Sequence, residues 1–170
     1  MTVDLPSEYC WARGFVTNHG YGVTSWFPDT VRGLDGLARV GQALVKHPTS
    51  DKHAATPIGS QNDVGDLAPF DGDHNYVKSY RWPSPDPKRM TDVVVNYTVH
   101  GKHTADEGAV IRFGMLMPDG RIRLVTYGEG NSWKQSPWLK FLWDDFTKEY
   151  WGNNANEIYR DARHATNGIR

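Results

Sequence analysis

The chain has a single cysteine and almost no net charge, and each of these absences excludes a class of protein. Cys10 is the only cysteine among 170 residues, so an intramolecular disulfide and a zinc site built from several cysteines are both excluded. Cys10 stands between two aromatic residues, where a small buried side chain is favoured over a nucleophile. A formal net charge of −1 disfavours a general nucleic-acid binder, because such proteins hold phosphates with an excess of lysine and arginine.

Long apolar runs are also missing. No stretch approaches the roughly 20 consecutive apolar residues of a membrane-spanning helix, so the sequence predicts no membrane span. The first ten residues contain neither the basic nor the apolar region of a secretory signal. Localisation therefore stays open between the cytoplasm and export by a signal-independent route. The length fits one α+β domain over residues 1–170, either by itself or as the C-terminal or an excised domain of a longer protein.

Alternating side chains predict a small antiparallel sheet. Valines alternate with polar residues and favour a strand over 92–100, and two further strands are expected over 109–117 and 121–128. The segment 48–90 is rich in proline and glycine, so we expect a long irregular loop that its apolar residues dock onto the fold. A short strand at 76–82 is the one regular piece expected within it.

Apolar residues at helical spacing predict that helices cover this sheet, which makes the fold class α+β. One helix is expected over 30–46 with Asp29 as its N-cap, and two C-terminal helices over 137–151 and 154–165. Gly152 is the expected end of the first C-terminal helix. Near the N-terminus, the sequence Asn-His-Gly-Tyr-Gly is typical of a turn between two short extended pieces.

A proline, an aspartate and a glycine at 118–120 predict a tight hairpin turn with Gly120 in the left-handed region. We expect Met117 to pair with Arg121 across this turn, and the register of the two strands then follows by counting. The expected pairs on one face are Arg112 with Thr126 and Leu116 with Ile122, and those on the other face are Phe113 with Val125 and Ile111 with Tyr127.

This register places Arg112 on a mostly apolar face, where a charge must be paired or must point into a cleft. Two interpretations follow. Arg112 forms a structural salt bridge, with an acid of the C-terminal helices as the expected partner. Alternatively, it holds a phosphate, a carboxylate or a developing oxyanion of a ligand.

Side chains suited to acid–base chemistry stand in or beside the predicted strands. A histidine with a carboxylate partner is a common general base, and imidazole titrates near neutral pH. An arginine or a tyrosine would stabilise charge beside such a pair. The alternative interpretation of the histidines and acids is that they are solvated turn residues. The candidate catalytic residues are His100, His103, Glu107, Arg112, Tyr127 and Glu129.

Two further groups are candidates for binding. Asp71, Asp73 and His74 offer ligands to a divalent cation, although aspartate is also a default residue of solvated loops. Trp82, Trp133 and Asn131 are candidates for contacts with substrate, because exposed aromatic rings stack on sugars and bases.

These patterns favour a small hydrolase that uses histidine and glutamate as acid and base, on a substrate that the sequence does not identify. A compact, cysteine-poor chain without a signal also fits a bacterial effector or toxin, whose partner would be an inhibitor or immunity protein. The alternative hypothesis is a non-catalytic binding module that recognises a glycan or a protein through exposed aromatic residues. An enzyme requires the catalytic candidates to converge on one cleft, whereas the binding module requires an exposed aromatic patch.

Overall fold

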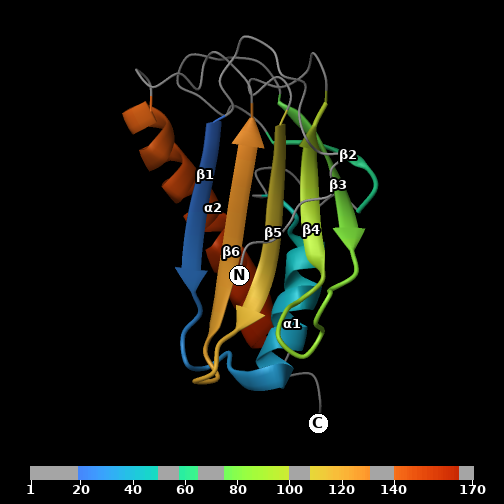
Figure 1. The fold of residues 1–170 in the computed structure, drawn as a ribbon, viewed down its shortest axis with the longest axis vertical. Coiled ribbons are helices and arrows are strands. Elements are labelled where there is room, and N and C mark those ends of the chain that lie inside the picture. The colour runs from blue at the N-terminus through green and yellow to red at the C-terminus, as the bar shows by residue number, and fades with distance from the viewer. Residues whose placement is uncertain (1–18, 50–57, 65–74, 100–107, 131–139, 165–170) are drawn as a thin grey trace.

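The computed structural model describes residues 19–49, 58–64, 75–99, 108–130 and 140–164, and of residues 19–21 and 140–148 it describes the backbone alone. Within these residues the chain forms one six-stranded antiparallel sheet with the strand order β1-β6-β5-β4-β3-β2. Two helices lie on the same side of this sheet (Figure 1), which confirms the predicted α+β fold. Neither helix is long and apolar enough to cross a membrane. The elements are β1 (His19–Trp26), α1 (Gly33–Lys46), β2 (Gln61–Asp63), β3 (Tyr76–Trp82), β4 (Val93–Thr98), β5 (Gly108–Leu116), β6 (Ile122–Gly130) and α2 (Lys140–His164).

The hairpin of β5 and β6 has the predicted register. The Met117 amide donates to the Arg121 carbonyl at 2.8 Å, and Gly120 has a φ of 82°. Arg112 therefore pairs with Thr126, while Phe113 pairs with Val125 on the opposite face. We call the face that carries Arg112 and packs against the helices the helix-facing side, and the opposite face the outer face.

The N-terminal prediction of a turn between two extended pieces is wrong. β1 is one continuous strand of eight residues, and it pairs with β6 in unbroken register from His19 opposite Gly130 to Trp26 opposite Arg123. Glycine weakens a strand by roughly 0.5–1 kcal/mol relative to alanine. The hydrogen bonds of a full-length ladder with β6 offset that weakness, which a local reading of the sequence does not reveal. β2, inside the segment expected to be irregular, is the other unpredicted strand, whereas the expected strand at 76–82 is confirmed as β3.

The C-terminal part is one helix of 25 residues, so the prediction that Gly152 separates two helices is wrong. A glycine inside a helix costs about 1 kcal/mol relative to alanine. The helix continues because the side chains that follow Gly152 pack against α1 and the sheet, and they gain more than this cost. These buried residues are Asn154, Ala155, Ile158 and Ala162.

The start of α1 also differs from the sequence-based prediction. Arg32 is the N-cap residue, without a side-chain capping bond, and Asp29 forms an exposed ion pair with Arg32 instead. Gly33, with a φ of 65°, turns the chain into the helix after the expected cap. The predicted span 30–46 therefore begins three residues too early.

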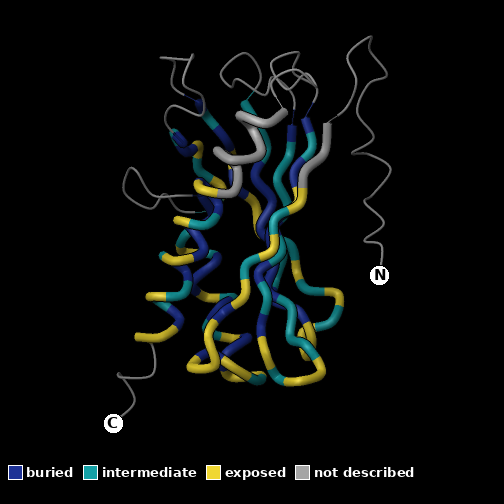
Figure 2. Tube along the Cα trace, turned by 90° about the vertical axis from the view of Figure 1, so that its left-hand side faces the viewer, coloured by how far each residue is buried: buried dark blue, intermediate teal, exposed yellow. Residues whose placement is uncertain are grey.

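The apolar core lies between α1, α2 and the part of the sheet nearest the β5–β6 turn. Figure 2 shows that buried positions line the interface between the helices and the sheet, whereas the outward side of the helices is exposed. Gly114 of β5 lies directly beneath α1, where an added Cβ atom would approach the Val40 Cγ1 atom to 3.0 Å. This close approach positions α1 on the sheet. The core residues are Phe27, Val31, Leu37, Val40, Ala43, Leu44, Val94, Ile122, Leu124, Ala155, Ile158 and Ala162.

Candidate functional site

Polar side chains replace the apolar core about half-way along the helix-facing side of the sheet. Each of five neighbouring strands contributes one, and every one of them is almost completely buried. A buried polar group costs free energy unless it is hydrogen-bonded, so the arrangement requires an explanation. We call this set the polar row. Its members are Asn62 of β2, Ser79 of β3, Asn96 of β4, Arg112 of β5 and Thr126 of β6.

Hydrogen bonds connect the members of the polar row across the strands. Asn62 Nδ2 donates to Ser79 Oγ at 3.1 Å, and Ser79 Oγ donates to Asn96 Oδ1 at 2.6 Å. Asn96 Nδ2 and Arg112 Nη1 both donate to the Pro48 carbonyl oxygen, at 2.9 and 3.3 Å. Arg112 Nε donates to the Thr126 hydroxyl at 3.2 Å. The Pro48 carbonyl, two residues after α1, thus joins β4 to β5.

The C-terminal helix contacts the polar row through Asn154 and Trp151. Asn154 Oδ1 accepts a short hydrogen bond from Arg112 Nη1, and the Trp151 ring centroid lies 4.4 Å from the guanidinium carbon. Asn154 Nδ2 donates to the Thr49 carbonyl at 2.6 Å. Arg112 therefore has a partner on the C-terminal helix, but among the described residues this partner is the amide of Asn154 and not the acid of the predicted salt bridge. The network fixes the end of α1, the sheet and α2 relative to one another.

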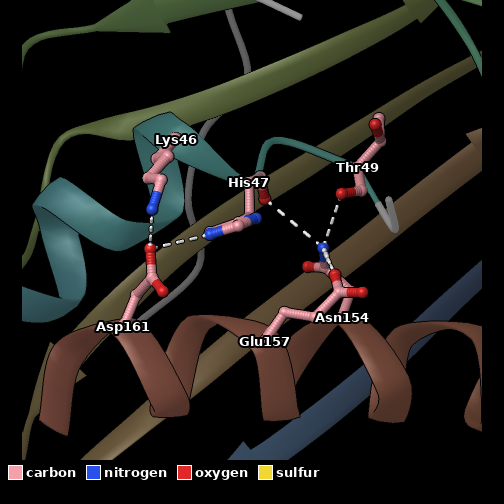
Figure 3. Close-up of polar contacts among 6 residues, drawn as sticks. All are labelled: Lys46, His47, Thr49, Asn154, Glu157 and Asp161. Carbon is pink, nitrogen blue, oxygen red and sulfur yellow. Dashed lines mark hydrogen bonds and ion pairs between the residues drawn. The ribbon is translucent and has the colours of Figure 1, made fainter. Parts of the chain in front are cut away.

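A second group of polar contacts lies beside this network, where the end of α1 meets α2 (Figure 3). Asp161 forms an ion pair with Lys46 and accepts a hydrogen bond from His47 Nε2 at 2.9 Å. The hydrogen bond from Lys46 is the largest of the effects that hold the pKa of Asp161 below its usual value of 3.8. Asn154 also donates to Glu157 Oε2 at 3.3 Å, so both acids of this group lie on α2. The group reinforces the attachment of α1 to α2.

The structure separates two of the catalytic candidates from Arg112. Tyr127 and Glu129 lie on the outer face, because they alternate with Thr126, the partner of Arg112. The Tyr127 hydroxyl donates to Glu129 Oε1, and this hydrogen bond to a carboxylate raises the pKa of Tyr127 to about 12. Arg112 and Tyr127 therefore do not contribute to one site, since the sheet lies between them.

The remaining candidates lie outside the described residues, apart from Trp82. Trp82 is half-buried at the end of β3, on the outer face. His100, His103 and Glu107 belong to the connection between β4 and β5, and Asn131 and Trp133 follow β6. Asp71, Asp73 and His74 precede β3, and the described residues contain no group of three or more side chains able to hold a metal ion.

The connections that carry these candidates all join the sheet at the same end. β4 ends there at Thr98, β5 begins there at Gly108, β6 ends there at Gly130, and β3 begins there at Tyr76 (Figure 1). We call this the loop end of the sheet. Trp82 lies at the opposite end, because the strands are antiparallel and β3 starts at the loop end.

Between the polar row and the loop end, strands β3 to β6 carry only short side chains on the helix-facing side. We call this region the small-residue zone. α1 packs on the same face of the sheet, but between the polar row and the β5–β6 turn. Val110 and Thr98 are half-buried there, and the Thr98 hydroxyl accepts a hydrogen bond from the Gly108 amide at 2.8 Å. The zone consists of Val77, Thr98, Gly108, Val110 and Gly128.

The sequence-based interpretation identified Arg112 but missed the rest of the polar row. One signal was available in the sequence. Asn96 is a polar residue that follows a run of valines. It lies two residues after Val94 in the same strand, so both side chains are on the face of the sheet that carries the core. Ser79 and Asn62 gave no such signal, because their alignment with Asn96 depends on strand register that the sequence does not specify.

Comparisons with known proteins identify the fold and nothing narrower. No family model matches the sequence, and no curated protein matches it. A protein of unknown function from Staphylococcus aureus superposes with a TM-score of 0.54 at 11% identity, over 90% of this chain and 98% of that one. A norcoclaurine synthase point mutant from Thalictrum flavum, in complex with a transition-state analogue, superposes with a TM-score of 0.51 at 12% identity, over 89% and 98%. The Zhui aromatase/cyclase from a Streptomyces species gives a TM-score of 0.48 at 12% identity, over 88% and 96%. The shared architecture is the helix-grip fold, whose members include enzymes.

Proposed function

We propose that the protein binds a small organic molecule on the helix-facing side of the sheet, in the small-residue zone. The observation that carries this proposal is the decrease in side-chain size along the helix-facing side of β6. Near the turn, Leu124 and Ile122 set the separation between the helices and the sheet. Beyond the polar row, β5 and β6 present only glycine and Val110 to that side, so these two strands leave room there for the atoms of a ligand.

The chemistry of the small-residue zone indicates an apolar or amphipathic ligand. Val77 and Val110 supply apolar surface, and the Thr98 hydroxyl is engaged by the backbone of Gly108. The polar row closes the zone toward the core, because its side chains bond to one another and to protein carbonyls. A synthase with the same fold that binds a transition-state analogue supports this use of the architecture.

The matched substitutions Val110→Trp and Ile111→Trp test this proposal. The two residues are adjacent and both half-buried, but Val110 lies on the helix-facing side and Ile111 on the outer face. With the amphipathic dye 8-anilinonaphthalene-1-sulfonate as the probe, we expect saturable binding to the native protein. An indole in the small-residue zone should weaken binding by about tenfold, the equivalent of roughly 1.4 kcal/mol.

Ile111→Trp is the control for a larger side chain in the same strand, and it should leave the dissociation constant unchanged. Circular dichroism and thermal unfolding establish that both variants are folded before titration. Equal losses in the two variants, or no saturable binding by the wild type, would contradict the proposed location.

A second candidate function is the hydrolase favoured by the sequence. The observation that supports it is the position of Thr98 and Gly108, which bound the connection carrying His100, His103 and Glu107 and which themselves belong to the small-residue zone. A histidine base activating water there, with a glutamate partner, would act on a ligand bound in that zone.

Turnover of chromogenic esters and phosphoesters decides between binding alone and hydrolysis. The variants are His100→Ala, His103→Ala and Glu107→Ala, and His164→Ala serves as the control because it is an exposed histidine at the end of α2. Loss of a general base should lower kcat/KM by about 10²–10⁴-fold. Activity that survives all three substitutions would exclude this catalytic assignment, and absence of turnover by the wild type on every substrate class would leave binding as the function.

A further inference from the structure

β1 is an edge strand with regularly arranged backbone groups along its free edge. It pairs with β6 alone among the described strands. Just after β1, the Phe27 amide donates to the Ile122 carbonyl, so odd-numbered residues direct their backbone groups toward β6. Because the direction alternates along a strand, Gly22, Thr24 and Trp26 direct their N–H and C=O groups toward the free edge.

The described side chains of this edge provide none of the usual protection against pairing with another chain. Edge strands are commonly protected by charged side chains, proline or bulges. From Gly22 to Trp26 the sequence is Gly-Val-Thr-Ser-Trp, which contains no charge and no proline, and the register with β6 has no bulge. The edge is therefore a template for an additional antiparallel strand.

We propose that β1 pairs with β1 of a second copy of this chain, in antiparallel orientation, about a two-fold axis that passes through Thr24. This register matches outward-directed backbone groups on both copies, as an antiparallel ladder requires. Thr24 then faces Thr24 of the partner subunit, and Trp26 faces Gly22 of the partner subunit. The sheets of the two copies become one continuous sheet.

The side chains on the outer face fit this two-fold arrangement. Trp26 is 48% exposed, and an added Cβ atom on Gly22 would meet no atom within 4 Å, so an indole has room to pack over that glycine. Two threonines directly opposite each other are a favourable cross-strand pair. Arg121 rests on the Trp26 ring at 4.6 Å and leaves the rest of the ring exposed.

A second copy is favoured over an unrelated peptide because this register is complementary to itself. Each copy supplies one large exposed ring and one glycine at matching distances from Thr24, so the same contact forms twice. An unrelated peptide would have to provide the same spacing by chance. This inference does not depend on the proposed ligand site, because the residues that make the contact, Gly22, Thr24 and Trp26, lie on the outer face.

Sedimentation velocity of the full chain, from low to high micromolar concentration, tests the proposal with three variants of one residue. The wild type is expected to approach twice the monomer mass as concentration rises. Thr24→Pro should be monomeric, because it removes an outward N–H group while leaving every β1–β6 hydrogen bond in place. Thr24→Val keeps that N–H group and should still dimerise. Thr24→Lys should be monomeric, because it brings two like charges together at the axis.

Two results would overturn the proposal. One is a wild type that stays monomeric at every concentration, which would leave the edge to some other partner. The other is a folded Thr24→Pro or Thr24→Lys protein that still dimerises, which would place the interface on another surface. Circular dichroism establishes that each variant is folded, and Thr24→Lys decides the matter if Thr24→Pro does not fold.

Discussion

Replacing Asn154 with alanine is expected to lower the free energy of unfolding by roughly 2–4 kcal/mol, the combined effect of losing a hydrogen bond to a buried charge and leaving a cavity. Asn154 is fully buried, and its Oδ1 atom accepts a hydrogen bond from the equally buried guanidinium of Arg112. Its Nδ2 atom also satisfies the Thr49 carbonyl beyond the end of α1. The alanine variant removes both interactions and leaves a cavity beside Trp151, because the neighbouring elements relax only in part.

The adjacent residue provides the control for this experiment. Asn153 is exposed on the same turn of α2, so Asn153→Ala should change stability by less than about 0.5 kcal/mol. Guanidinium-induced unfolding followed by circular dichroism at neutral pH measures both values. Similar effects of the two substitutions would show that the network around Arg112 does not hold α2 on the sheet.

The parts of the fold that were predicted correctly depend on local chemistry. A glycine at 120 after proline and aspartate determines the turn, and the turn determines the β5–β6 register one pair at a time. The expected strand at 76–82 and the helix that ends at Lys46 likewise depend on patterns within a few turns or pairs. A short-range pattern is sufficient for β3 and for the β5–β6 hairpin because each strand pairs with a neighbour along the chain. For α1 the pattern is the helical repeat within the element itself.

The errors share a physical cause, which is that tertiary packing overrode a local preference. Gly152 favours a helix end by itself, but burial of Ala155 and Ile158 keeps the helix intact. The glycines of β1 favour a turn, but a complete ladder with β6 stabilises a strand. In both cases the element that stabilises the structure, α1 and the sheet for α2 and β6 for β1, is far away in the sequence, so a local pattern does not reveal it.

The candidate site was predicted less well than the fold, because the prediction did not separate the two faces of each strand. The predicted register already places Arg112 opposite Thr126, so Tyr127 and Glu129 must lie on the other face. Grouping all of them into one site relied on their proximity in sequence, although a strand directs successive side chains to opposite faces. The polar row was missed because Ser79 and Asn62 reach Asn96 only through the sheet order of β2, β3 and β4.

Removing Arg112 itself is the second large effect that we expect. Arg112→Met should lower the free energy of unfolding by roughly 2–4 kcal/mol, because it leaves buried acceptors without their donor. These acceptors include Asn154 Oδ1 and the Pro48 carbonyl oxygen, which keeps one donor in Asn96. Methionine replaces much of the volume of the arginine side chain, so the cost reports mainly on hydrogen bonding rather than on a cavity.

The double variant Arg112→Met with Asn154→Leu distinguishes a coupled network from two independent residues. A donor and its acceptor are removed together, so neither is left buried alone, and the loss should be smaller than the sum of the single losses by about 1–3 kcal/mol. Chemical unfolding of the wild type, Arg112→Met, Asn154→Leu and the double variant gives this difference. Losses that simply add would mean that Arg112 and Asn154 stabilise the fold separately. A clear shortfall would mean that their contact holds α2 against the sheet.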